Sequence, residues 1–90
     1  MTNPSICIPQ LNKNINKNII LTTFNKHNFG KIKKINLIQS GKIQIAFIHF
    51  YYWFNTKKSL KVKNILLLGQ DFKIMYDDPW YFKCVIAHNN

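Results

Sequence analysis

Residues 42–54 read KIQIAFIHFYYWF, and this stretch decides the fold. A strand of a small globular domain normally alternates apolar and polar residues, because one of its faces is buried and the other meets water. Here both sets of alternate positions are apolar. The stretch therefore predicts a strand that buries one set of side chains in a core and presents a second apolar set on the opposite face of a sheet.

The segments around this strand predict the element order β-α-β-β-α-β within a single domain, residues 1–90. Ser40-Gly41 predicts a tight hairpin turn before it, because glycine tolerates positive φ. Phe29-Gly30 and Gly69 are expected to end the two helices. In order, the expected elements are a strand at 5–11, a helix at 15–28, strands at 31–39 and 42–54, a helix at 55–69 and a strand at 71–77. Residues 79–90 are expected to form an aromatic C-terminal extension.

The two predicted helices are supported by patterns of their own. The first carries an apolar stripe at helical spacing, with Ile15, Ile19 (or Ile20), Thr23 and Phe24. The second opens with a choice of N-cap residues, namely Asn55, Thr56 and Ser59. Between the helices, Ile35 and Leu37 are candidates for the inward side of the second strand.

This order predicts an α+β, ferredoxin-like fold, in which four antiparallel strands carry two helices on one face. The first and third strands are expected in the centre of the sheet and the second and fourth at its edges. In the third strand, the residues expected to point to the helices are Ala46, Ile48 and Phe50, and those expected on the uncovered face are Ile45, Phe47, His49 and Tyr51.

Residues 43–50, IQIAFIHF, resemble the third-strand motif of the RNA-recognition motif, K/R-G-F/Y-G/A-F-V-x-F/Y. The positions that fit are Ala46, Phe47, Ile48 and Phe50, and those that depart are Ile43, Gln44 and Ile45. The first strand, ICIPQL, resembles the partner motif, with Cys7 where a stacking aromatic is expected. The resemblance implies that bases stack on exposed rings of these strands. Only Phe47 of the expected rings is present, and His49 and Tyr51 are candidate substitutes.

A second resemblance involves residues 74–83, IMYDDPWYFK. This segment is similar to the Tyr-acid-Pro-Trp-aromatic-Lys ending of small RNA-recognition-motif-like proteins encoded by giant nucleocytoplasmic DNA viruses. The abundance of Lys, Asn and Ile suits an A/T-rich genome of that kind. The resemblance implies a viral origin rather than a mechanism.

The formal net charge of +10 and the pI near 9.9 point to an anionic partner. Every basic residue is Lys, which offers a point charge to a phosphate but no bidentate fork to a base, so sequence specificity is expected to be low. Lys34, Lys73 and Lys83 are expected near the uncovered face. Lys34 also belongs to an edge-strand group with Lys31 and Lys33, where lysine can serve to prevent edge-to-edge pairing. The second helix is expected to carry a solvated lysine face, formed by Lys57, Lys58, Lys61 and Lys63.

These patterns predict a non-catalytic module that binds single-stranded nucleic acid, RNA rather than DNA. The expected contact residues are Phe47, His49, Tyr51, Ile45, Cys7, Lys34, Lys73 and Lys83. The alternative is a protein-interaction module or a virion structural or packaging component that uses the same apolar face, including a homodimer through the sheet. In that alternative the segment from Trp80 to Phe82 folds back over Ile45 and Phe47 and partly covers the face.

Other classes of function lack their sequence signals. No metal-ligand spacing links His27, His49, His88, Cys7 and Cys84, and Asp77-Asp78 is typical of a turn before Pro79. No nucleophile set, phosphate loop or nucleotide fingerprint is present, so neither an enzyme, a cofactor nor a small-molecule ligand is expected. The apolar run is too short to span a bilayer, and the start lacks a signal-peptide pattern. With only two cysteines, the expected location is a reducing one: host cytoplasm, virus factory or virion, and not a secreted protein.

Overall fold

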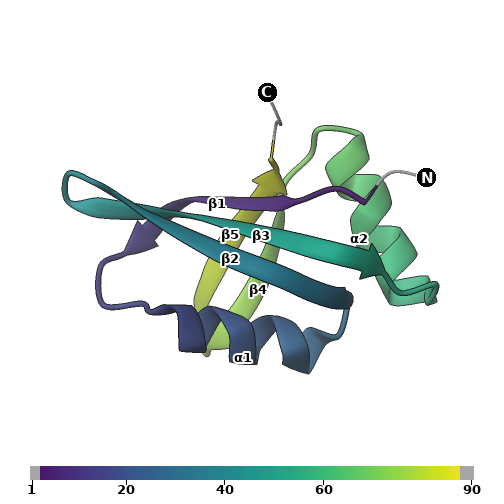
Figure 1. Cartoon of the computed structure of the whole chain (residues 1–90), viewed down its shortest axis with the longest axis horizontal. Coiled ribbons are helices and arrows are strands. Elements are labelled where there is room, and N and C mark those ends of the chain that lie inside the picture. Colours follow the sequence, from purple (N-terminus) through teal and green to yellow (C-terminus); the bar gives the residue numbers. More distant parts are fainter. Residues whose placement is uncertain (1–2, 88–90) are drawn as a thin grey trace.

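The computed structural model describes residues 3–87 and shows an α+β arrangement of two helices and a five-stranded antiparallel sheet (Figure 1). The elements are β1 Ile6–Asn12, α1 Lys17–His27, β2 Gly30–Ser40, β3 Ile43–Trp53, α2 Lys57–Leu67, β4 Phe72–Asp77 and β5 Trp80–Ile86. The strands lie in the order β2-β3-β1-β5-β4. As predicted, β1 and β3 are central and β2 and β4 are edge strands.

The prediction of four strands is wrong, because β5 forms within the segment 79–90 that was expected to be an extension. Two residues, Asp78 and Pro79, connect β4 to β5, and Trp80 pairs with Asp77. Along β5, Phe82 and Cys84 are buried while their neighbours Tyr81 and Lys83 are exposed, which is the alternation of a half-buried strand. The last part of the expected extension, 88–90, lies outside the described residues.

Helix α1 is capped by asparagines at both ends. The Asn16 side chain accepts a hydrogen bond from the Ile19 backbone N–H at 2.9 Å. Asn28 takes the left-handed conformation at φ 60° and ends the helix, where Phe29-Gly30 was expected to do so. Gly30 instead begins β2, where a Cβ atom would overlap the Tyr52 carbonyl oxygen and lie 2.9 Å from the Trp53 Cα. Glycine is needed there for close approach of two strands.

Helix α2 begins and ends as its sequence predicts, with Thr56 as N-cap and Gly69 after its last turn. The Gly69 N–H donates to the Leu66 carbonyl at 2.9 Å and the Gln70 N–H to the Ile65 carbonyl at 3.0 Å, which together form a Schellman motif. Its buried residues are Ser59 and Leu66. Three other apolar side chains of this segment are exposed: Leu60, Leu67 and Leu68.

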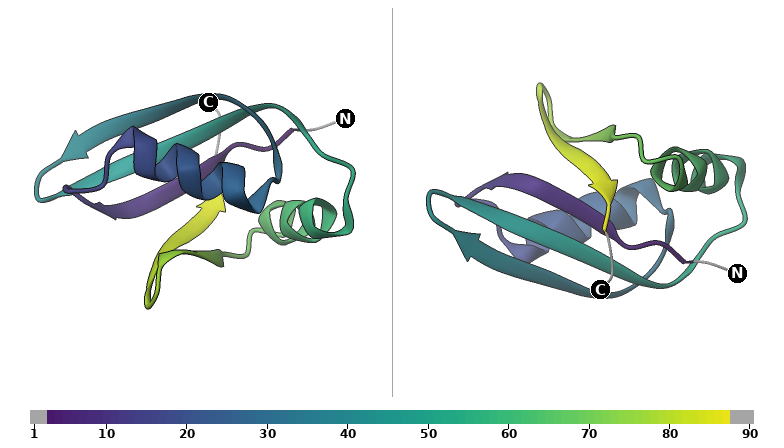
Figure 2. Two further views of the ribbon diagram at one scale, coloured as in Figure 1. Left: turned by 90° about the horizontal axis from the view of Figure 1, so that it is seen from below. Right: turned by 90° about the horizontal axis from the view of Figure 1, so that it is seen from above.

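The core lies on one side of the sheet and joins both helices to all five strands. Ala46 and Ile48 of β3 are fully buried in it and Phe50 nearly so, as the alternation predicts. From the helices, the core receives Ile20, Phe24 and Leu66. Figure 2 shows α1 in front of the strands in the view from below and behind them in the view from above, so the opposite face of β1, β2 and β3 carries no helix.

Candidate nucleic-acid interface

A row of paired residues crosses four strands on the face opposite the core. Val85 of β5 lies opposite Cys7 of β1, Cys7 lies opposite Phe47 of β3, and Phe47 lies opposite Asn36 of β2. Paired residues point to the same face of a sheet, and all four are half-buried. We call this surface the open face. Phe47 stands at its centre, flanked by a thiol on one side and an amide on the other.

His49 lies next to Phe47 on the same face and is held at both ring nitrogens. Its Nδ1 is 2.8 Å from the Ser5 hydroxyl, and its Nε2 is 3.3 Å from Asn36 Nδ2, which can only donate. Burial lowers the pKa of His49, and the nearby charges of Lys34 and Lys33 lower it further. The imidazole is therefore neutral near pH 7, and it offers a flat ring rather than a cation.

Tyr51 lies at the rim of the open face, where the pairing of β2 and β3 is irregular. Ile32 pairs with Phe50 and Lys31 with Tyr52, which leaves Tyr51 outside the ladder and 57% exposed. The ammonium groups of Lys31 and Lys33 each lie 6.0 Å from the Tyr51 ring centroid.

This rim combines an exposed ring with two cations. In single-strand-binding proteins, a ring of this kind stacks on a base and the cations attract the phosphate backbone. Lys31 and Lys33 had been interpreted as edge-strand lysines, and the irregular pairing that brings them to Tyr51 has no sequence signal.

Ile45 and Cys7 add apolar surface to the open face. Ile45 lies opposite Ile38 of β2, whose side chain is 49% exposed. The Cys7 thiol is free, and burial raises its pKa, so at neutral pH it is a protonated, weakly polar group. Both residues therefore offer contact area rather than charge or nucleophilic chemistry.

The β4–β5 hairpin extends the open face with a second basic and aromatic group. Lys73 pairs with Lys83, and Met75 pairs with Tyr81. The Lys73 ammonium lies 4.9 Å from the ring centroid of Tyr81, which is 49% exposed. Lys83 also lies 3.8 Å from Asp71 in an exposed ion pair. Tyr81 was not among the predicted contacts, and its alternation with Phe82 is the signal that could have found it.

The alternative in which the segment from Trp80 to Phe82 folds back over the sheet is not what the structure shows. Phe82 is 2% exposed and stacks on Tyr76 on the core side, with ring centroids 4.2 Å apart. Trp80 is 63% exposed and lines a pocket next to the start of α1. Because Trp80 opens a strand that pairs within the sheet, neither ring lies over Ile45 or Phe47. The open face keeps its exposed surface.

Six of the eight residues expected to bind lie on the face of β1, β2 and β3 opposite the core or at its rim, and the other two lie on the β4–β5 hairpin, which turns away from β1 (Figure 2). Cys7, Ile45, Phe47, His49 and Lys34 occupy the open face of β1, β3 and β2, Tyr51 lies at its rim, and Lys73 and Lys83 extend it onto the hairpin. The chemistry that this surface can offer is stacking on neutral rings and charge attraction by lysine.

The described part of the chain also bears on other kinds of site. Residues 3–87 contain no group of three or more His, Cys, Asp or Glu side chains that could hold a metal ion. His88, one of the histidines considered, lies outside the described residues. Within 3–87, neither helix has the length and apolar character needed to cross a membrane.

No protein-family model, no curated protein sequence and no solved structure matches this chain. The open face is therefore interpreted from its own rings and charges.

Proposed function

We propose that this chain is a ferredoxin-like, RNA-recognition-motif-like domain that binds single-stranded nucleic acid, RNA in preference to DNA, through the open face. The element order supports the fold assignment, since β5 takes the place beside β1 that a fourth strand takes in the four-stranded arrangement, and β4 is added at the edge. The resemblance of residues 43–50 to the third-strand motif supports the preference for RNA.

One observation carries the proposal: rings and lysines gather on a sheet face that no described helix covers. Phe47 lies at its centre, Tyr51 at one end and Tyr81 at the other, each next to lysine or polar groups. Base stacking on such rings contributes about 1–3 kcal/mol per base and tolerates any sequence, because every base has a π face. The proposed binding is therefore non-catalytic, and stacking on the open face is itself weakly sequence-specific.

Lysine supplies the second part of the binding free energy. Lys34, Lys73 and Lys83 stand beside His49 and Tyr81, where the phosphates of stacked nucleotides would pass. A contact to a phosphate of a single strand releases a counterion, so each contact contributes about −0.7 to the slope of log affinity against log salt. Three such contacts predict a slope of about −2.

The test is a fluorescence-anisotropy titration of labelled single-stranded RNA and DNA with the wild type, Phe47→Ala and Leu68→Ala. Leu68 is the matched control, because its apolar side chain is 74% exposed on the segment after α2, away from the open face. Loss of one stacking ring should weaken binding by about ten-fold. Binding that is unchanged in Phe47→Ala, or equally weakened in Leu68→Ala, contradicts the proposal.

A second candidate function, a protein contact or virion component, is favoured by one feature of the same face. Ile38 is 49% exposed on edge strand β2 and continues the apolar surface of Ile45. If this surface joins two copies, sedimentation should reveal a dimer that Ile38→Lys converts to a monomer. A wild-type monomer that binds RNA favours the first candidate.

A further inference from the structure

The β4–β5 hairpin diverges from β1. The described pairing of β5 with β1 consists of Ile86 opposite Ile6 and Val85 opposite Cys7, at the end of β5. From there β1 continues to Asn12 while the hairpin turns away from it, as both views of Figure 2 show. Two pockets lie along this divergence, and Trp80 lines both of them.

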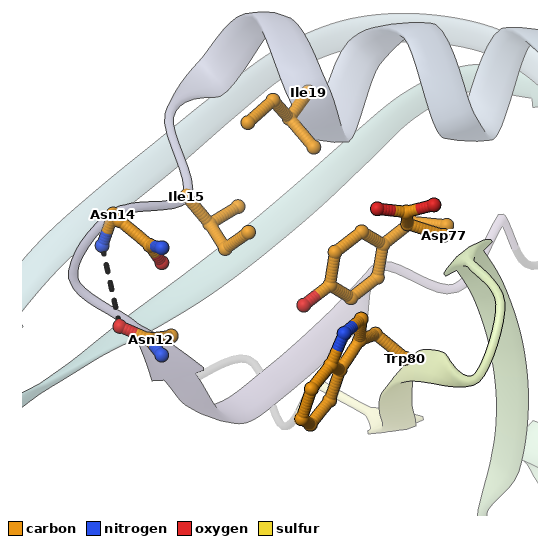
Figure 3. Close-up of a pocket in the computed structure, with 7 residues that line it drawn as sticks. Asn12, Asn14, Ile15, Ile19, Asp77 and Trp80 are labelled. Atoms are coloured by element: carbon orange, nitrogen blue, oxygen red, sulfur yellow. Dashed lines mark hydrogen bonds between the residues drawn. The ribbon is translucent and has the colours of Figure 1, made fainter.

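The larger pocket has a volume of about 550 Å³, within the usual range for small-ligand sites of about 300–1,000 Å³. Figure 3 shows Ile15 and Ile19 on its α1 side and Trp80 on its hairpin side. The Trp80 side chain is 63% exposed, an unusual degree for so large a ring. The pocket thus combines two isoleucines and the ring of Tyr76 with polar side chains, and it has an accessible indole on which a flat heteroaromatic ring can stack.

The polar groups of the pocket come from Asn12 and Asn14 on one side and from Tyr76 and Asp77 of β4 on the other (Figure 3). The backbone N–H of Asn14 donates to Asn12 Oδ1 at 3.4 Å, so the side-chain NH₂ is the group that Asn12 offers to a ligand. Asp77 of β4 lines the other side, and its carboxylate can only accept hydrogen bonds. A matching ligand needs adjacent donors for the carboxylate and acceptors for the amide.

We propose that this pocket binds a guanine base of the single strand, an inference that rests on the proposed function. Guanine presents two adjacent donors, N1–H and the N2 amino group, which match the two oxygens of Asp77. Its O6 atom, next to N1–H, is an acceptor for the amide NH₂ of Asn12. Adenine, cytosine and uracil lack a pair of adjacent donors on one edge, so they leave the carboxylate partly unpaired.

The second pocket connects this site to the open face. It has a volume of about 480 Å³, and Pro9, Tyr81, Lys83 and Trp80 are among its lining residues. Tyr81 and Lys83 belong to the basic and aromatic group of the hairpin. A strand that follows the open face therefore reaches the guanine pocket with Tyr81 available to the preceding base and Lys83 to its phosphate.

The test compares labelled eight-nucleotide RNAs that contain only uridine or one guanosine among uridines. The guanosine should tighten binding by about five- to a hundred-fold in the wild type, as a bidentate base contact does. Asp77→Asn should abolish this preference while leaving the affinity for uridine unchanged. Asp78→Asn is the matched control, since it removes the same charge one residue away. Trp80→Ala should also lose the preference, and a preference retained in Asp77→Asn or Trp80→Ala overturns the proposal.

Failure of this inference is distinct from failure of the proposed function. If the uridine strand binds and the guanosine adds nothing, the guanine pocket alone is wrong. If neither strand binds, guanosine monophosphate tests the pocket directly by NMR. The monophosphate should shift the indole N–H signal of Trp80 saturably. The indole N–H signal of Trp53 should stay unchanged, because its Nε1–H donates to the Pro4 carbonyl at 2.9 Å in the core. Absence of that shift, or monophosphate binding as tight as that of the strand, contradicts a pocket for strand guanine.

Discussion

At the scale of the residue, His49 links the open face to pH. Burial, and then Lys34 and Lys33, hold its pKa below the ordinary value of 6.5. Below pH 6.5 the imidazole of His49 binds a proton in the unfolded chain but not in the folded chain. The stability contributed by neutral His49 is therefore complete above pH 6.5. It is lost as the pH falls toward the pKa of His49 in the folded chain. The free energy of unfolding, measured with urea, should decrease from neutral pH to about pH 5, and less so in His49→Gln.

His27 provides the control, because burial also lowers its pKa while it lies far from the open face, beside Lys58. His27→Gln should leave the contribution of His49 in place. An NMR titration that gives His49 a pKa above 6.5 would show that its ring is charged rather than neutral at mildly acidic pH.

At the scale of the element, β5 determines whether the open face is free. Phe82 is 2% exposed and stacked on Tyr76, so Phe82→Ala should lower the free energy of unfolding by about 3–5 kcal/mol. Tyr81→Ala, which removes a ring that is 49% exposed on the opposite side of the same strand, should change it by less than about 1 kcal/mol. Chemical denaturation measures both, and equal effects would mean that β5 does not alternate between core and surface.

The elements also show what the sequence could predict. The alternation in β3 separated core from open face correctly, because each side chain of a strand has one of only two directions. The three consecutive leucines at 66–68 point in several directions around a helix, and the pattern could not tell that Leu66 alone is buried. The fifth strand was missed because the aromatic residues after Pro79 suit a lid as well as a strand, and only pairing with β1 decides between them. The pocket at Trp80 could not be predicted either, because it lies where the β4–β5 hairpin diverges from β1.

At the scale of the whole molecule, the net charge of +10 attracts any polyanion. A test of RNA binding must therefore compare lysines at different places on the surface while the net charge is kept equal. Two double variants remove equal charge. Lys73→Gln/Lys83→Gln, the first pair, removes it from the hairpin end of the open face, and Lys57→Gln/Lys61→Gln, the second pair, removes it from the exposed surface of α2. The first pair should make the salt slope of RNA binding shallower by about 1.4, and the second should leave it nearly unchanged. Equal slopes would indicate attraction without a defined site.

The most direct test of a nucleic-acid-binding open face is an NMR titration of isotope-labelled protein with a short single-stranded RNA. The row Val85, Cys7, Phe47 and Asn36 should show the largest saturable shifts, together with the ring signals of Tyr51 and Tyr81. Signals of α2, including Lys57 and Lys61, should stay in place. Shifts that concentrate on α2, or no saturable shift at low salt, would contradict the open face as a nucleic-acid interface.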